Sequence, residues 1–90
     1  MFARVETFQT EPAGMDELIT AQHKTVGLVR TLPGNMGGYL LVNRDTGKAL
    51  SVTYWEDEDA RAAAESEFGA ASVRGDVELY AVAMQEALST

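Results

Sequence analysis

The side chains of this sequence best suited to proton transfer or to binding a charged group are Arg4, Glu6 and His23. Arg4 and Glu6 stand two positions apart in F-A-R-V-E-T-F, which has the composition of a strand, so both would project from one face, roughly 7 Å apart. In a pocket, Glu6 would act as a base or hydrogen-bond acceptor, and Arg4 would hold an anionic oxygen of a substrate. An ion pair at a sheet edge or an interface explains the same two residues without any chemistry.

His23 is the only histidine of the chain. Histidine exchanges protons near neutral pH, so His23 suits a general base that removes the proton of a phenol. The anion so formed can give an electron to O2 with no metal or flavin. The alternative for His23 is a half-exposed position on a helix flank. The neighbouring Gln22 interrupts an apolar helix stripe, where its amide needs either a polar partner or a wet cavity.

Aromatic and polar side chains farther along the chain complete the candidate pocket. Aromatic rings with one polar end suit a site for flat molecules, although Trp55 could equally close the end of a barrel. An expected second helix carries alanines on its inward face, which either pack closely on a sheet or leave volume for a ligand. The candidate catalytic residues are His23 and Glu6, and the candidate substrate-binding residues are Arg4, Gln22, Tyr39, Thr53, Trp55 and Phe68.

The composition argues against several classes of function. Ninety residues make one domain, spanning 1–90. The 14 acidic and 7 basic residues give a net charge of −7, and the basic residues are scattered, so nucleic-acid binding is not expected. With no cysteine and one histidine, the chain offers no disulfide, thiolate metal site or multi-histidine zinc site, and we expect neither metal nor cofactor.

Neither a signal peptide nor a membrane span is expected. The first residues, M-F-A-R-V-E, lack a signal pattern, and no apolar run approaches the ~20 residues of a membrane span. We therefore expect a cytoplasmic protein with no membrane partner.

Hydrophobic periodicity and turn residues predict six elements, β-α-β-β-α-β. Gly47 would end the R-D-T-G turn of a hairpin with a positive φ, and Asp57 would cap the second helix. This order is typical of the α+β ferredoxin-like fold, with two helices on one face of a four-stranded antiparallel sheet. The expected elements are Phe2–Phe8, Met15–Arg30, Tyr39–Asn43, Ala49–Trp55, Glu58–Phe68 and a last strand within Asp76–Ala87.

The other face of this sheet would be bare. In the second hairpin strand Leu50, Val52 and Tyr54 share one face, and the first and last strands add further apolar residues to both faces. Such a surface exceeds what a monomer usually exposes. We therefore expect a homodimer that pairs sheet face on sheet face with two-fold symmetry.

Three segments together carry a family resemblance: F-A-R-V-E-T-F followed by P-A-G, then P-G-N-M-G-G-Y-L-L, then S-V-T-Y-W-E-D-E-D-A. In this order and spacing the chain resembles the antibiotic biosynthesis monooxygenase-like family of the dimeric α/β-barrel superfamily. The resemblance implies two ferredoxin-like subunits whose sheets form a barrel, with one pocket per subunit between helices and sheet. Members include cofactor-independent monooxygenases that act on aromatic polyketide-like or quinol substrates, haem-degrading proteins and small-molecule binders.

The haem-degrading branch of this family is disfavoured. That branch uses an asparagine on the first strand, a tryptophan on the second helix and a histidine after that helix. Glu6 and Ala64 stand at the first two positions, and the segment from Ser72 to Arg74 holds no histidine.

The resemblance therefore leads us to expect a small homodimeric, cofactor-free oxidoreductase. It would be a monooxygenase or related tailoring enzyme acting on an aromatic, polyketide-like or quinol molecule. A binding or stress-response protein that uses the same pocket without catalysis is the first alternative. A purely structural dimerisation domain is the second.

Overall fold

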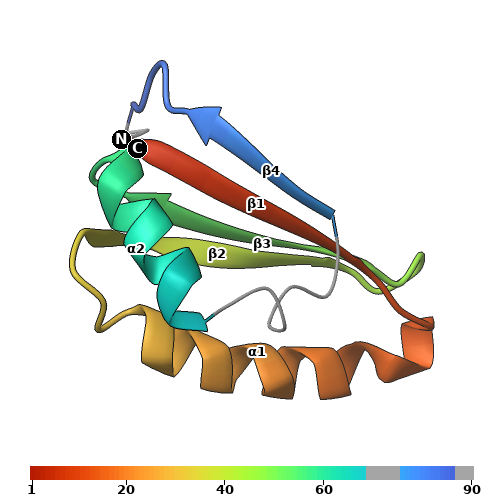
Figure 1. The fold of residues 1–90 in the computed structure, drawn as a ribbon. Helices are drawn as coiled ribbons and strands as arrows, with labels where there is room; N and C mark the ends of the chain where they lie inside the picture. The colour runs from red at the N-terminus through yellow and green to blue at the C-terminus, as the bar shows by residue number, and fades with distance from the viewer. Residues whose placement is uncertain (69–75, 87–90) are drawn as a thin grey trace.

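The computed structural model describes residues 1–68 and 76–86. Two helices lie on one face of a four-stranded sheet whose strand order is β2-β3-β1-β4, with every neighbouring pair antiparallel (Figure 1). This is the α+β ferredoxin-like fold that the sequence predicts. The elements are β1 (Phe2–Gln9), the 3-10 turn η1 (Pro12–Gly14), α1 (Met15–Val29), β2 (Asn35–Asn43), β3 (Lys48–Trp55), α2 (Glu58–Phe68) and β4 (Asp76–Ala81).

The turn and cap residues act as the sequence predicts. Gly47 has φ of +79° in the β2–β3 turn, where an added Cβ would lie 1.9 Å from the carbonyl oxygen of Thr10. Gly47 therefore closes the turn and lets it lie against the end of β1. The backbone N–H of Ala60 donates to Asp57 Oδ1 at 2.8 Å, so Asp57 caps α2.

Strand register decides which side chains of the sheet lie beneath the helices. Arg4 pairs with Thr53, and Glu6 pairs with Ser51. Directly paired residues share a face, so these four side chains lie on the helix-facing side. Arg4 and Glu6 are therefore not on the bare face.

The packed core lies at one end of the molecule. Phe8, Met15 and Ala49 are buried there, and partly buried aliphatic side chains of α1 and β2 pack against them. Farther along α1, Gln22 is half-buried and Val26 is 46% exposed. The second half of α1 is therefore less tightly covered than its first turn.

The opposite face of the sheet carries mostly apolar side chains, and no element of residues 1–68 or 76–86 covers it. Tyr39, Leu41 and Tyr80 are 66%, 51% and 48% exposed. The rings of Tyr39 and Tyr54 meet edge to face, with centroids 6.4 Å apart. Neither helix in the described part of the chain is long and apolar enough to cross a membrane.

The strand bounds differ from the prediction most at β2, which begins at Asn35 rather than Tyr39. Asn35 already pairs with Trp55, before an irregularity between Asn35 and Gly38. β1 and β3 are each one residue longer than predicted, and β4 lies within the predicted Asp76–Ala87.

Candidate functional site

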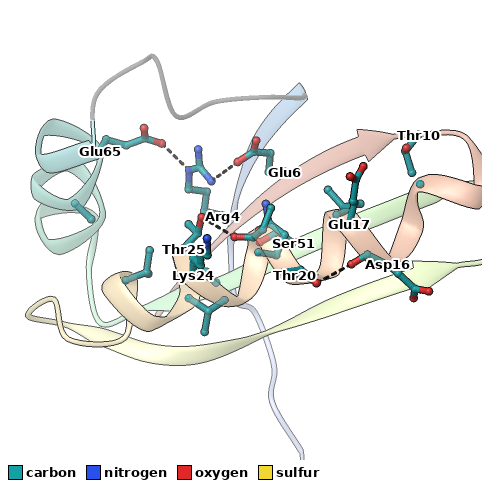
Figure 2. Close-up of a pocket in the computed structure, with 18 of the residues that line it drawn as sticks. Arg4, Glu6, Thr10, Asp16, Glu17, Thr20, Lys24, Thr25, Ser51 and Glu65 are labelled. Carbon is teal, nitrogen blue, oxygen red and sulfur yellow. Dashed lines mark hydrogen bonds and ion pairs between the residues drawn. The ribbon is translucent and has the colours of Figure 1, made fainter.

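A pocket of about 980 Å³ lies between the two helices and the helix-facing side of the sheet (Figure 2). β1 contributes Arg4 and Glu6, β3 contributes Thr53 and Trp55, and α1 contributes Gln22 among others. The volume is within the range of small-molecule sites. The pocket extends along α1 from the charged groups near α2 to the first turn of α1.

An ion pair between neighbouring side chains of β1 forms the centre of the site. Arg4 Nη1 donates to Glu6 Oε1 at 3.0 Å, and Arg4 Nε donates to Glu65 Oε1 on α2 at 2.6 Å. The side chains of Arg4 and Glu6 are 16% and 7% exposed, whereas Glu65 is 31% exposed. One guanidinium is therefore held between two carboxylates, one from the sheet and one from a helix.

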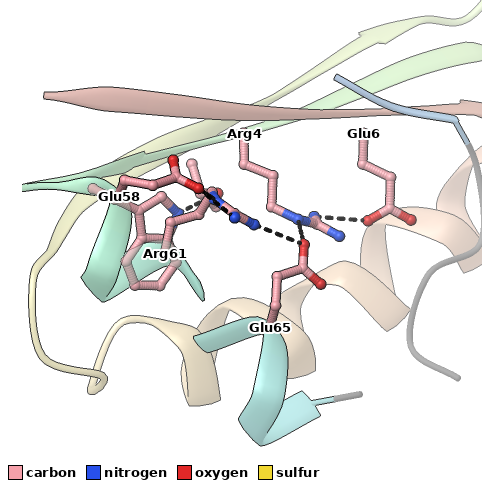
Figure 3. Close-up of polar contacts among 7 residues, drawn as sticks. Arg4, Glu6, Glu58, Arg61 and Glu65 are labelled. Atoms are coloured by element: carbon pink, nitrogen blue, oxygen red, sulfur yellow. Dashed lines mark hydrogen bonds and ion pairs between the residues drawn. The ribbon is translucent and has the colours of Figure 1, made fainter. Parts of the chain in front are cut away.

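A second arginine extends this network along α2 (Figure 3). Arg61 lies 3.7 Å from Glu65 Oε1, and it donates from Nε and Nη2 to Glu58 Oε1. The hydrogen bond from Arg61, followed by its positive charge, lowers the pKa of Glu58, and the same bond raises the pKa of Arg61. We call Glu58, Arg61, Glu65, Arg4 and Glu6 the charge network; it contains three carboxylates and two guanidinium groups.

Trp55 forms a fixed wall beside this network. Its side chain is 2% exposed, and its indole Nε1–H donates to Thr53 Oγ1 at 3.0 Å. The indole donor is satisfied within β3 and the ring is covered by its neighbours, so Trp55 forms a fixed apolar boundary of the pocket.

The α1 side of the pocket is lined by small hydroxyl and charged side chains. Thr20 and Thr25 donate their hydroxyls to the carbonyl oxygens of Asp16 and Ala21, one turn earlier in the helix. Their oxygens can still accept a hydrogen bond from a ligand. Asp16 pairs with Arg44 at 3.0 Å at the exposed rim.

Five of the eight residues proposed from the sequence line this one pocket: Arg4, Glu6, Gln22, Thr53 and Trp55. Their placement together agrees with a site beneath the helices, and their role in ligand binding stays a prediction. The side chain of Phe68 lies outside the part of the chain that the structure describes.

Two proposed residues are placed elsewhere. His23 is exposed and does not line the pocket, because the half-buried Gln22 beside it takes the inward position on α1. Tyr39 pairs with Val52, so its ring lies on the bare face of the sheet, against Tyr54. The assignment of these two side chains to the pocket of their own chain is therefore wrong.

Sequence reasoning missed Glu65 and Arg61, both of which line the pocket. Their spacing of four positions on a helix was the available signal, because residues i and i+4 lie on one helix face. Among residues 1–68 and 76–86, no group of three acidic or histidine side chains could hold a metal ion.

Comparison with known proteins agrees with this architecture. The sequence profile of the family described as antibiotic biosynthesis monooxygenase matches residues 1–71. No curated protein matches the chain in sequence.

Several solved structures are similar in fold. An antibiotic biosynthesis monooxygenase candidate from Deinococcus radiodurans has a TM-score of 0.80 at 11% identity, with all of both chains covered. The haem-degrading protein Rv3592 from Mycobacterium tuberculosis has a TM-score of 0.77 at 17% identity, over 96% of this chain and 98% of that one. The ActVA-Orf6 monooxygenase of Streptomyces coelicolor, in complex with nanaomycin D, has a TM-score of 0.67 at 20% identity, over 98% and 92% of the two chains.

The pocket does not fit a haem whose iron is held by a histidine of the same chain. The chain has one histidine, His23, and it lies exposed outside the pocket.

Proposed function

Since the chain belongs to the antibiotic biosynthesis monooxygenase family, we propose that it is a cofactor-independent monooxygenase for a small aromatic molecule of the quinol or polyketide type. One observation carries this proposal: the buried carboxylate of Glu6 and the guanidinium of Arg4 meet in a pocket of about 980 Å³. Trp55 supplies a fixed apolar boundary of this pocket.

Glu6 is the candidate acid–base residue. It would accept the proton of a bound phenol, and the phenolate would give one electron to O2. Carbon–oxygen bond formation opposite the phenol oxygen would give a hydroperoxide. The O–O bond of that hydroperoxide breaks with loss of one water, so one phenol and one O2 become one quinone and one H2O.

The proposed enzyme is a homodimer. The bare face of the sheet exposes Tyr39, Leu41 and Tyr80, with no element of residues 1–68 or 76–86 over it. A second copy with two-fold symmetry would cover this surface with the same surface. The helix-facing pocket would then lie on the outer side of each sheet.

Oxygen uptake tests the enzymatic proposal. The purified protein would be incubated with a panel of mono- and dihydric naphthols and anthrols, with air and without it. We expect consumption of one O2 per quinone formed, at a rate proportional to protein and above the rate without protein. Equal rates with and without protein across the panel would contradict an oxygenase.

A binding protein without catalysis is the second candidate function. It is favoured by the engagement of Arg4 with two carboxylates and by the position of His23 outside the pocket. Both facts leave few groups poised for proton transfer. Saturable binding of the same aromatic molecules, with no oxygen uptake, would support this candidate.

A further inference from the structure

We propose that Glu65 makes this pocket select uncharged ligands over anionic ligands of the same shape. Glu65 does so as a specificity-determining residue, because it cancels the charge of Arg4 without removing Arg4 as a hydrogen-bond donor. This inference rests on the proposed function, in which the pocket binds small aromatic molecules. It replaces the expectation that Arg4 binds a substrate oxygen that is already anionic when the substrate enters.

The guanidinium of Arg4 lies between two carboxylates, and this position is the first observation that supports the proposal. Its guanidinium donates to Glu65 at 2.6 Å and to Glu6 at 3.0 Å. An arginine paired with one carboxylate is neutral as a unit, and Arg4 is paired with two. At 16% exposure of the Arg4 side chain, water screens these charges less than it does at the surface. The two carboxylates therefore already neutralise the positive charge of Arg4, and an incoming carboxylate would be attracted only weakly.

Donors remain on Arg4 for an uncharged oxygen. A guanidinium has five N–H groups, and the contacts of Arg4 with Glu65 and Glu6 use Nε–H and one N–H of Nη1. Neither of the contacts that the structure describes for Arg4 uses its Nη2 group, and Arg4 lines the pocket. A ketone or phenol oxygen can accept from this group without bringing a charge into the site.

The other charged groups that line the pocket likewise offer little net attraction to an anion. Arg61 is engaged by Glu58 and Glu65, so it does not offer an unpaired charge. Asp16, Glu17 and Lys24 line the pocket from α1 and are exposed to solvent, and Asp16 is paired with Arg44. Among the described residues that line the pocket, four are acidic and three are basic, and both arginines are paired with carboxylates.

The proposed reaction is consistent with this selectivity. A neutral phenol would enter, and its proton would pass to Glu6. One of the two carboxylates on Arg4 then loses its charge, and Arg4 can pair with the phenolate instead. The positive charge of Arg4 is therefore masked during binding and available after proton transfer.

A matched pair of ligands tests the proposal. 2-Acetylnaphthalene and 2-naphthoate have nearly the same shape, but only the second is charged at neutral pH. Calorimetric titration would give both dissociation constants for the wild-type protein, Glu65→Gln and Asp16→Asn. Both variants lose one carboxylate that lines the pocket and pairs with an arginine, but only Glu65 pairs with Arg4.

We expect the wild-type protein to prefer 2-acetylnaphthalene. Glu65→Gln should shift the ratio of the two dissociation constants toward the anion by about tenfold or more, because the change unmasks a positive charge in a partly buried site. Asp16→Asn should shift the ratio by less than about threefold, since the rim is exposed to solvent. An equal shift in the two variants, or no shift in Glu65→Gln, would overturn the proposal.

Arg61→Gln gives a second test with the opposite sign, which keeps the proposal falsifiable if Glu65→Gln does not fold. Removal of Arg61 leaves the charge network more negative, so the preference for the uncharged ligand should increase. An unchanged or reversed preference would overturn the proposal. If the wild-type protein binds neither ligand, the proposed function fails and this inference fails with it; binding of 2-acetylnaphthalene with no effect of Glu65→Gln overturns the inference alone.

Discussion

Arg4 on β1 and Glu65 on α2 are 61 positions apart in the chain, yet Arg4 Nε lies 2.6 Å from Glu65 Oε1 (Figure 3). This contact joins the second helix to the sheet beside the pocket. Among the residues that the structure describes, few other polar contacts link α2 to β1. The position of the helical wall therefore depends on this pair of charges.

A double-mutant cycle on Arg4→Gln and Glu65→Gln tests this dependence. We expect a coupling free energy of about 1–2 kcal/mol from denaturant unfolding, because Arg4 is largely buried and Glu65 is only partly exposed. The control is the cycle on Arg44→Gln and Asp16→Asn, whose side chains are 59% and 86% exposed. Its coupling should stay below about 0.5 kcal/mol. Equal couplings in the two cycles would mean that the Arg4–Glu65 contact does not hold the helix.

The second prediction concerns acid stability and Glu58. The hydrogen bond from Arg61 lowers the pKa of Glu58 in the folded protein below its usual 4.5. The resulting stabilisation is therefore present above pH 4.5 and is lost as the pH falls through the lower folded pKa. Thermal melting of the wild-type protein and Glu58→Gln should show a stability difference that is constant near neutral pH and shrinks below pH 4.5. A difference that does not shrink as the pH falls below 4.5 would contradict the role of this pair.

The third prediction concerns the core. Met15 has no exposed surface and packs against Phe8 and Ala49. Met15→Ala should lower the free energy of unfolding by about 2–5 kcal/mol, since it leaves a cavity in the one packed cluster at this end of the molecule. Leu28→Ala, on the same helix, removes a side chain that is 61% exposed and should cost less than about 1 kcal/mol. Similar losses in the two variants would show that the core lies elsewhere.

The fourth prediction concerns the dimer. Leu41→Glu places a charge on the bare face, where burial against a second copy would be costly. Sedimentation should give about twice the chain mass of 9.7 kDa for the wild-type protein and a single-chain mass for Leu41→Glu. Leu28→Glu changes an equally exposed leucine on α1 and should leave the dimer intact. A wild-type protein that sediments as one chain at micromolar concentration would refute the dimer.

Local patterns were sufficient to predict the fold. The alternation in β1 and β3 assigns Arg4 and Glu6 to one face, and Gly47 and Asp57 mark a turn and a helix start. Each of these features depends on residues within a few positions of one another, which is why a single sequence reveals them.

The site was predictable only in part, because its contacts are not local. Arg4 meets Glu65 only after α2 folds back over β1. The position of Tyr39 depends on the register of β2 against β3, and a shift of one residue moves a side chain to the other face. Likewise, a rotation of one position on α1 separates the half-buried Gln22 from the exposed His23. Small errors in register or helix phase therefore change which side chains belong to a pocket.

In the proposed reaction Glu6, and not His23, carries the proton transfer of a cofactor-free oxygenase. The most direct measurement is oxygen uptake with one naphthol substrate by the wild-type protein, Glu6→Gln and His23→Ala. We expect Glu6→Gln to lower kcat by about 100-fold or more and His23→Ala to leave kcat within about twofold, because only Glu6 lines the pocket. Loss of turnover in His23→Ala, with turnover by Glu6→Gln unaffected, would contradict the assignment of proton transfer to Glu6.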